Sequence, residues 1–358
     1  KMEDLKKQLR APRSKKQKVL KSESLSTGST LLNLACTGHA GGGFSMGDYV
    51  SVVGDSVSGK TFLALTCLAE ASINPNFDKH RLIYDNAERG ARMNMEKFFG
   101  KRLADRLESP AKDGEIPMFS ETVEDFYFFV DDAIKQGDPF VYILDSMDSV
   151  ASDADLAKFD ELKDAHRAGK QTTGSYGDGK AKKNSEGLRR LIPKLANTKS
   201  ILIIISQTRD NLGFGFEKKS RSGGHALRFY ATLELWSSTE SKIKRTVKGK
   251  PRQLGINSKV QIKKNRTTGA ERTITVPIYH SHGIDDIGSC VAYLIDEKHW
   301  AKKGTRIVAA EFDLVQSESD LIKTIEANGW EDRLRELVEK VWNDIEEACV
   351  VKRKSRYE

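Results

Sequence analysis

Short apolar runs recur through the first two thirds of the chain, and each is followed by small, polar or acidic residues. The runs are Tyr49–Val53, Arg81–Tyr84, Phe140–Leu144 and Ile201–Ile205. Helical patterns separate them, for example in Thr61–Ser72 and Thr122–Lys135. Near-continuous apolar runs that alternate with helices are typical of parallel strands buried on both faces. The pattern predicts an α/β fold of three layers with a mostly parallel central sheet.

The spacing of apolar positions changes after Ile205. Apolar and polar residues then alternate in Phe229–Trp236, Lys259–Lys263 and Thr273–Tyr279, with little helical pattern between them. Such alternation predicts antiparallel strands with one exposed face, which we expect to extend the same sheet. One stretch, Asp153–Asn184, is rich in Gly, Lys, Asp and Ser and predicts a long loop or insertion.

The two ends of the chain differ from this central part. Apolar residues return at helical spacing in Trp330–Ala348, which predicts a small α-rich C-terminal domain. The first 22 residues hold nine basic and two acidic side chains. This segment either packs on a neighbouring protomer or forms a solvated arm. The predicted parts are a basic arm (1–24), a core (25–285) and a C-terminal domain (286–358).

Composition narrows the class of protein. With 358 residues, 38% of them hydrophobic, and only 8 Pro, the chain is too apolar for a disordered protein and unlike a fibrous one. Its net charge of +8 favours a polyanionic partner. The four cysteines form no CxxC pair, which argues against a disulfide framework or a zinc knuckle. No apolar run reaches the ~18 residues of a membrane span, so we expect a cytoplasmic protein without membrane contact.

A phosphate-binding motif follows the first buried strand. The segment Gly54-Asp55-Ser56-Val57-Ser58-Gly59-Lys60-Thr61 matches G-x-x-x-x-G-K-[ST] and lies between a predicted strand and a predicted helix. Its glycines let successive backbone N–H groups point at phosphate oxygens, while Lys60 reaches the β and γ phosphates. The Thr61 hydroxyl is then a ligand for Mg²⁺. We expect a nucleoside triphosphate to bind here.

Two acidic residues follow other buried strands. Asp145 ends the run Phe140–Leu144, where a carboxylate beside the phosphate loop can hold Mg²⁺ through water. Glu88 follows Arg81–Tyr84 and is placed to polarise the water that attacks the γ-phosphate. Asp85 is the alternative for that role, and either acid could instead be a solvated loop residue.

With these motifs in place, the chain resembles the RecA family of recombinases from about Ser24 to Asp286. The resemblance rests on Ser26-Thr27-Gly28-Ser29, Gly41–Gly43, Met46-Gly47, Asp145-Ser146, Ile204–Arg209 and Gly223–Ala231. It implies that Glu88 is the catalytic glutamate and that Gln207 is a switch. Gln207 ends a central strand, so its amide could touch the γ-phosphate on one side and move the loop Thr208–Ser222 on the other.

The resemblance also implies two DNA-binding segments. The loop Thr208–Ser222 and the glycines that close it offer cations for phosphates, a glycine for close backbone approach and an apolar wedge. These residues are Arg209, Gly213, Phe216, Lys218, Lys219, Arg221, Gly223 and Gly224. The second segment begins the helix after a first loop, and its backbone contacts are Lys182, Ser185, Arg189 and Arg190. Residues at i, i+3 and i+7 share one helix face, so Lys182, Ser185 and Arg189 can face one row of phosphates.

Residues 241–272 hold eleven basic side chains and one acidic. Such a run is often an exposed solvated face. RecA-like proteins instead bind ATP between subunits, so the resemblance implies that Lys264 and Arg266 reach the neighbour's site and stabilise the transferring phosphoryl group. It also implies a helical filament with heterologous contacts between subunits.

These features together predict a DNA-dependent ATPase that needs ATP and Mg²⁺. It would form filaments on single-stranded DNA and pair them with double-stranded DNA in recombination and repair. The divergent ends and long first loop suggest a phage or mobile-element version of the family. Two alternatives remain open: a RecA-core ATPase without strand exchange, such as an accessory paralogue, ring helicase or regulator, and a small-molecule kinase with the same phosphate loop.

Overall fold

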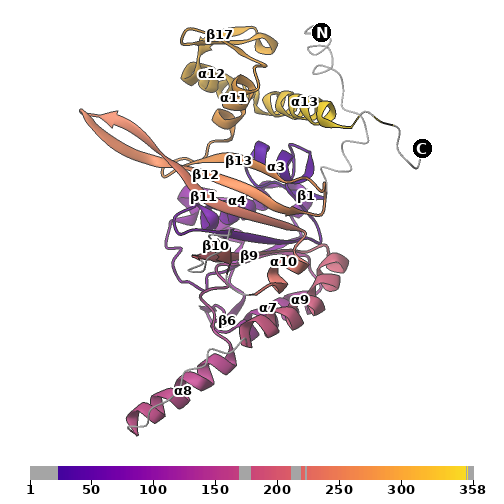
Figure 1. Ribbon diagram of the computed structural model, residues 1–358, viewed down its shortest axis with the longest axis vertical. Helices are drawn as coiled ribbons and strands as arrows, with labels where there is room; N and C mark the ends of the chain where they lie inside the picture. Colours follow the sequence, from indigo (N-terminus) through magenta and orange to yellow (C-terminus); the bar gives the residue numbers. More distant parts are fainter. Residues whose placement is uncertain (1–22, 169–178, 211–218, 222–223, 352, 354–358) are drawn as a thin grey trace.

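A large twisted sheet with helices on both faces forms the centre of the molecule (Figure 1). The computed structural model describes residues 23–168, 179–210, 219–221, 224–351 and 353. The predicted three-layer α/β architecture with a mostly parallel central sheet is confirmed. The predicted N-terminal arm lies outside the described residues except for Glu23 and Ser24.

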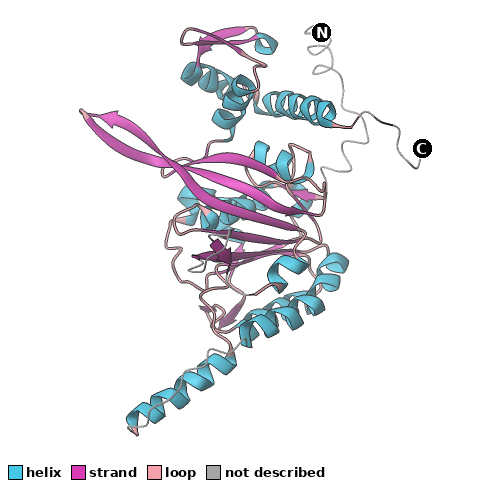
Figure 2. Ribbon diagram, viewed as in Figure 1, coloured by secondary structure: helices cyan, strands magenta, loops and turns pink. Residues whose placement is uncertain are grey.

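The central sheet has ten strands, and five of its pairings are parallel (Figure 2). In spatial order the strands are β14 (Gly283–Ile284), β13 (Arg272–Tyr279), β12 (Lys250–Asn265), β11 (Leu233–Val247), β3 (Tyr49–Gly54), β9 (Ile201–Asp210), β8 (Phe140–Leu144), β4 (Arg81–Asp85) and β5 (Leu107–Glu108), and β10 (Lys219–Arg221) pairs with β9. The parallel part runs from β11 to β5, and antiparallel strands extend it from β11 to β14. The apolar runs of the sequence therefore form the middle of the sheet, and the segments with alternating apolar and polar residues form the strands on one side of it.

Successive residues of the central strands contribute to two separate hydrophobic cores. On β9, Ile201, Ile203 and Ile205 face one core, whereas Leu202 and Ile204 face the other. The first core is covered by α3 (Thr30–Thr37) and α4 (Lys60–Ile73), and the second by α7 (Val123–Lys135) and α9 (Gly179–Thr198). Burial on both faces explains why these strands are apolar at most positions.

Short elements complete the core. They are β1 (Ser24–Leu25), β2 (Phe44–Ser45), a 3-10 turn at Pro75–Phe77, α5 (Met95–Phe99), α6 (Lys101–Arg106), β6 (Ala111–Asp113) and β7 (Ile116–Met118). Asn33 anchors the segment that leads into the core, because its Oδ1 accepts hydrogen bonds from the backbone N (2.9 Å) and Oγ1 (2.8 Å) of Thr27. Its amide also donates to the carbonyl oxygen of Ala40 at 2.9 Å.

The region of strands β11 and β12 differs from the sequence prediction. We expected a strand over Phe229–Trp236, but Ala226–Tyr230 forms a short helix, α10, and the strand begins at Leu233. We also expected Lys259–Lys263 to be a short strand, whereas β12 runs from Lys250 to Asn265. Together β11 and β12 make a long hairpin that continues beyond the sheet (Figure 1). Its outer half is exposed on both faces, so it has no alternating apolar positions to mark it.

The prediction of a long loop over Asp153–Asn184 is also partly wrong. Asp153–Arg167 forms a helix, α8, which projects away from the body of the molecule (Figure 1). Ser152 caps it: the Ser152 side chain accepts from the backbone N of Asp155, and the Asp155 side chain accepts from the backbone N of Ser152. Asn184 lies inside α9. The polar composition concealed α8 because none of its residues is buried.

The C-terminal part contains more than the expected helices. The helices are α11 (Asp286–Asp296), α12 (Glu318–Ala327) and α13 (Glu331–Cys349), and a 3-10 turn covers Ala310–Phe312. A three-stranded antiparallel sheet of β15 (Ala301–Lys303), β16 (Arg306–Ala309) and β17 (Leu314–Ser317) accompanies them. Asp286 ties this part to α3, since its carboxylate accepts from the backbone N of Thr30 (2.6 Å) and from Nε of Arg335 (3.1 Å).

Helices α7 and α9 pack closely at one point where a glycine makes room for a ring. Gly187 of α9 lies against Tyr127, and a methyl group added at Gly187 would lie 2.3 Å from Cε1 of that ring. The Tyr127 hydroxyl then donates to Oδ1 of Asn184 at 3.0 Å. This contact sets the position of the helix that carries the predicted DNA-binding face.

We expect Gly187→Ala to lower the free energy of unfolding by roughly 1–2 kcal/mol. Helix propensity alone favours Ala by about 1 kcal/mol, but overpacking a buried contact costs typically about 1–3 kcal/mol, and the clash here is with a buried ring. Urea denaturation followed by circular dichroism measures the change. Glu186→Ala, on the exposed side of the same turn, is the control and should stay within about 0.5 kcal/mol of the parent. A Gly187→Ala protein as stable as the parent would contradict this packing argument.

Candidate functional site

The phosphate loop leaves β3 at Gly54 and enters α4 at Lys60. Gly59 is the N-cap with φ +91°, a conformation that side chains disfavour, and a Cβ there would lie 2.6 Å from Cδ1 of Ile278. No side chain caps the helix, and no acidic residue stands in its first turn. The N–H groups of that turn and the helix dipole therefore favour an anion at this position.

Lys60 is turned into this loop. Its Nζ donates to the carbonyl oxygens of Gly54 at 2.8 Å and Asp55 at 2.6 Å. Burial lowers the pKa of Lys60, and the nearby carboxylates of Asp145 and Glu88 oppose that shift. A phosphate oxygen carries more charge than a carbonyl oxygen, so a bound triphosphate is a stronger acceptor for this ammonium group. The geometry fits the predicted role of Lys60.

Asp145 lies directly after β8 and is almost completely buried. One carboxylate oxygen, Oδ2, accepts from Oγ1 of Thr61 at 2.7 Å and from the hydroxyl of Tyr84 at 2.9 Å. Burial raises the pKa of Asp145, and these two hydrogen bonds act in the opposite direction. A hydroxyl and a carboxylate oxygen at this separation are suitable donors for Mg²⁺ and its water shell, so Thr61 and Asp145 fit the predicted metal site.

Tyr84 is a functional residue that the sequence analysis missed. It lies on β4 and its ring belongs to the first hydrophobic core, so in the sequence it contributes only to an apolar run. Its hydroxyl nevertheless donates a hydrogen bond to Oδ2 of Asp145. The only sequence signal available was the choice of Tyr over Phe at a buried strand position. Tyr84 therefore orients the carboxylate independently of Thr61.

Glu88 and Gln207 are in direct contact. Gln207 Nε2 donates to Oε1 of Glu88 at 3.0 Å, and Oγ of Ser146 donates to the same oxygen at 2.6 Å. The backbone N of Gln207 donates to Oδ2 of Asp148 at 2.6 Å. Gln207 thus contacts the candidate catalytic glutamate, and Ser146 and Asp148, which had no assigned role, hold the two in place.

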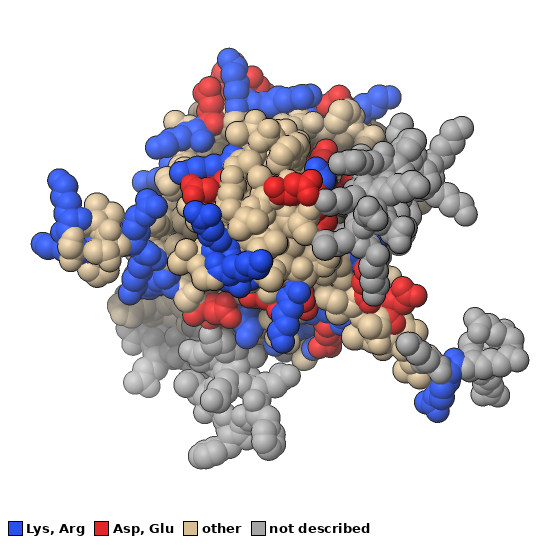
Figure 3. Space-filling view, turned by 90° about the horizontal axis from the view of Figure 1, so that it is seen from above, with Lys and Arg blue, Asp and Glu red and all other residues tan. Residues whose placement is uncertain are grey.

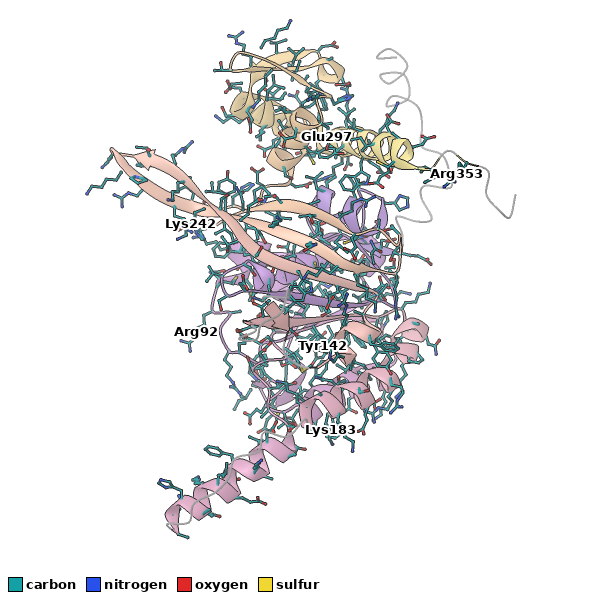
Figure 4. All side chains as sticks on the ribbon, in the orientation of Figure 1. Arg92, Tyr142, Lys183, Lys242, Glu297 and Arg353 are labelled. Carbon is teal, nitrogen blue, oxygen red and sulfur yellow. The ribbon has the colours of Figure 1, made fainter. Side chains whose placement is uncertain are left out.

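Asp85, the alternative to Glu88, is held elsewhere. It is completely buried, and its carboxylate accepts from the backbone N of Ser120 at 3.0 Å and from the hydroxyl of Tyr142 at 2.7 Å. Figure 4 labels Tyr142 within the central layer of the molecule. Burial raises the pKa of Asp85. This carboxyl group therefore braces the sheet, and Glu88 is the acid that faces the cavity.

A cavity of about 490 Å³ lies over these groups. One side is polar and is formed by Ser56–Thr61, Glu88, Asp145 and Gln207. Other walls are Phe62, Met93 and Phe98. Strand β12 contributes Ile256 from its interior, and the end of β13 and the residue after it contribute Ile278, Tyr279 and His280. A polar floor with apolar and aromatic walls matches the two chemistries of a nucleotide, namely phosphates and a flat base. The residues present therefore fit ATP with Mg²⁺.

We expected Gln207 to end its strand, but β9 continues to Asp210 because residues 208–210 pair with β10. The residue after Gln207 contacts the phosphate loop through its side chain. Oγ1 of Thr208 donates to Oδ1 of Asp55. Asp55 occupies a position of the motif that can be any residue, so the pattern gave no reason to single out this side chain for such a role. A shift of the phosphate loop would therefore move the start of the second predicted DNA-binding segment through this hydrogen bond.

The residues of α9 that were predicted to contact DNA are accessible. Lys182, Arg189 and Arg190 are exposed on α9, and Ser185 is partly exposed on the same helix. The neighbouring Lys183, labelled in Figure 4, instead pairs with Glu124, with Nζ and Oε1 3.3 Å apart. Buried Asn184 and Gly187 face Tyr127, so the cations lie on the solvent side of the helix.

The second predicted DNA-binding segment is only partly described. Gly213, Phe216, Lys218 and Gly223 lie outside the described residues, and only the backbone is described for Arg209, Lys219 and Arg221. That backbone forms a short antiparallel ladder, in which Arg221 pairs with Thr208 and Lys219 with Asp210. Gly224 has φ +85°, and a Cβ there would lie 2.8 Å from Cβ of Ala181. The end of this segment therefore contacts the start of α9.

Lys264 and Arg266 lie together near the end of α10. Nζ of Lys264 donates to the carbonyl oxygens of Arg228 at 2.5 Å and Phe229 at 2.8 Å, and Nη2 of Arg266 donates to that of Phe229 at 2.8 Å. Both cations thus interact favourably with the C-terminal end of a helix. Phe229 beside them is 65% exposed. Within one chain, neither cation lines the nucleotide cavity.

Among the described helices, none has the length and apolar character needed to cross a membrane.

Three cysteines, Cys36, Cys67 and Cys290, are buried free thiols. Burial raises the pKa of each of these thiols, so they are poor nucleophiles. The chemistry of the site is therefore that of its carboxylates, lysine and amide.

Comparison with known proteins agrees with this geometry. Residues 11–285 match the model of the RecA N-terminal domain family. "DNA repair protein recA homolog 3, mitochondrial" of Arabidopsis thaliana is 30% identical over 286 residues, which cover 78% of this chain but only 59% of that relative. "Protein RecA" of Parvibaculum lavamentivorans is 26% identical over 77% of this chain and 67% of that relative. "Protein RecA" of Limosilactobacillus reuteri is also 26% identical, over 90% of this chain and 80% of that relative. The chain belongs to the RecA N-terminal domain family.

Proposed function

We propose that the protein is a DNA-dependent ATPase that forms filaments on single-stranded DNA and promotes homologous pairing and strand exchange. The observation that carries this proposal is the contact of Gln207 with Glu88 at the mouth of the nucleotide cavity. Gln207 is also the last residue before the segment that contacts the start of α9. One residue therefore connects the group expected to activate water with the segments expected to hold DNA.

The residues around the cavity have separate roles in this proposal. Lys60 and the N–H groups of the first turn of α4 bind the phosphates, while Thr61 and Asp145 hold Mg²⁺, which neutralises phosphate charge when it is bound. Glu88 orients the attacking water and takes up its proton. Its Oε1 already accepts two hydrogen bonds, from Ser146 and Gln207, so its carboxylate has a defined direction.

ATP binding is communicated to DNA through Gln207. A γ-phosphate competes with Glu88 for the Nε2 donor of Gln207, so the side chain adopts different partners before and after hydrolysis. Thr208 follows Gln207 directly and bonds Asp55 of the phosphate loop, which gives the signal a second route. The segment after Thr208 and the face of α9 with Lys182, Ser185, Arg189 and Arg190 then bind the DNA backbone.

Filament formation places each nucleotide between two subunits. Lys264 and Arg266 of one subunit reach the triphosphate of its neighbour, and exposed Phe229 beside them contributes apolar contact. The arm 1–24, the core 25–285 and the C-terminal part 286–358 then have distinct positions in the filament, with the arm against the adjacent core. The protein acts in the cytoplasm on single-stranded and double-stranded DNA.

The rate of ATP hydrolysis with and without single-stranded DNA tests this function. We expect DNA to stimulate hydrolysis at least tenfold, because the ordered loops bring Gln207 and Glu88 into position, and we expect filaments by negative-stain electron microscopy. Absence of both would exclude the recombinase. Stimulated hydrolysis with filaments but no exchange between homologous strands would instead favour a RecA-core ATPase with an accessory role.

Glu88→Gln should abolish most hydrolysis but keep nucleotide binding. The amide is close to the carboxylate in shape but cannot take a proton, so we expect turnover to fall by about 10²-fold or more while the affinity for a fluorescent ATP analogue stays within a few-fold. Glu96→Gln, on the exposed surface of α5, is the matched control and should behave as the parent. Wild-type turnover by Glu88→Gln would assign the catalytic role to another group.

Mixing two inactive variants tests the shared site. The double variant Lys264→Ala, Arg266→Ala and the single variant Lys60→Ala should each lose hydrolysis, the first with nucleotide binding intact. In an equal mixture, about a quarter of heterologous interfaces join an intact phosphate loop to an intact cation pair. We expect DNA-stimulated activity to return in the mixture to a comparable fraction of wild type. If the mixture stays inactive, or if the double variant turns over normally, the two cations do not act across the interface.

A further inference from the structure

The outer part of the β11–β12 hairpin is a strongly basic surface outside the nucleotide site. This hairpin tip, residues 241–254, contains six cations and no acidic residue: Lys242, Lys244, Arg245, Lys248, Lys250 and Arg252. It projects from the body of the molecule, and Figure 3, seen from above, shows blue side chains without red ones at its end. Figure 4 labels Lys242 where the hairpin leaves the sheet.

The charges of the hairpin tip do not stabilise the hairpin itself. In the strand register Arg245 lies directly opposite Arg252, and like charges in that arrangement destabilise a strand pair. Every residue from 244 to 253 is exposed, so the ribbon has no core on which to pack. Among the described residues no acidic side chain forms an ion pair with any of the six cations. These cations are therefore available to an external anion.

The turn of the hairpin also has a cation, at a position where its backbone conformation is unfavourable. Lys248 and Gly249 have φ of +52° and +72°, which makes a two-residue turn with both central residues in the left-handed region. Asn, Asp or Gly normally occupies the first of these positions, because other side chains are strained there. Lys248 thus places a cation at the outermost point despite its backbone conformation. Strain without a local compensating contact is a mark of function.

The base of the hairpin is connected to the nucleotide site. Oγ1 of Thr239 donates to the carbonyl oxygen of Val57 at 3.2 Å, and Oγ of Ser258 donates to that of Ser58 at 2.7 Å. Both acceptors belong to the phosphate loop. The hairpin therefore leaves the sheet beside that loop, and its direction depends on the loop's position.

We propose that the hairpin tip binds the phosphates of double-stranded DNA, as a contact separate from α9 and the segment after Gln207. A two-stranded ribbon has the dimensions that the major groove of B-DNA admits, and cations on both strands and at the turn then face the flanking phosphates. The hairpin tip has no aromatic residue to anchor a protein partner, so an acidic protein surface fits it less well. This inference rests on the proposed action on DNA and adds a duplex-binding element to it.

The test removes charge at the hairpin tip and measures duplex binding by the full-length protein. The variant carries Lys244→Gln, Arg245→Gln, Lys250→Gln and Arg252→Gln, and the control carries Lys79→Gln, Lys97→Gln, Lys101→Gln and Lys112→Gln, which are exposed cations elsewhere. Each protein is saturated with unlabelled poly(dT) and an ATP analogue that is not hydrolysed. A labelled duplex is then titrated by fluorescence anisotropy over a series of salt concentrations.

We expect duplex binding by the hairpin variant to weaken roughly tenfold or more at low salt. The slope of log affinity against log salt should also fall by about 0.9 for each phosphate that the variant no longer neutralises. The control variant should bind as wild type, and hydrolysis stimulated by poly(dT) should be the same in all three proteins. Unchanged duplex affinity and slope in the hairpin variant would overturn the inference. An equal loss of affinity in the control would do the same, as would displacement of the duplex by polyglutamate at matched charge.

The two proposals fail in different ways. If poly(dT) stimulates hydrolysis but the hairpin variant binds duplex normally, only the role of the hairpin tip is wrong. If wild-type protein neither binds poly(dT) nor responds to it, the proposed action on DNA fails and the hairpin inference fails with it.

Discussion

The carboxyl edge of four adjacent parallel strands is the constraint on which the site depends. Strands β3, β9, β8 and β4 are buried on both faces, so the charged groups of the site lie at or beyond the carboxyl ends of these strands. The phosphate loop, Asp145 and Glu88 follow β3, β8 and β4, and Gln207 lies within β9 near its carboxyl end. Because β9 lies between the strands that lead to the phosphate loop and to Asp145, a residue near its end contacts both halves of the site. The hydrogen bond from Gln207 to Glu88 is the direct result of this strand order.

Much of this arrangement could be predicted because its signals are local in the sequence. Apolar runs marked the buried strands, and the phosphate loop is recognisable because glycines and a lysine are needed at set positions. The partners of these residues could not be predicted. Tyr84 contributes to an apolar run whether its hydroxyl is bonded or not, and only the fold brings that hydroxyl to Asp145. The separation of Glu88 from Asp85 likewise depends on Ser120 and Tyr142, which are distant from both in sequence.

Two of the errors in the predicted fold share a cause, which is that exposed elements lack an apolar period. Helix α8 buries no residue, so its helical character lies in the capping box of Ser152 and Asp155 and not in its composition. The outer half of the β11–β12 hairpin is exposed on both faces, and its charged residues therefore gave no strand signal. Both elements project from the body of the molecule, where burial cannot explain why they persist.

The net charge of +8 has different physical meanings in different parts of the chain. Lys60 is buried and turned toward carbonyl oxygens, so a bound phosphate improves its environment. Lys264 and Arg266 satisfy the carbonyl oxygens at the end of α10, so reaching a neighbouring subunit would cost them existing hydrogen bonds. In the hairpin tip Arg245 lies opposite Arg252, and within the described part of the chain no carbonyl oxygen accepts a hydrogen bond from the side chains of its cations. An anion is therefore bound with the least structural rearrangement at the hairpin tip, whereas the cations near α10 need the additional contacts of an assembled interface before they can act.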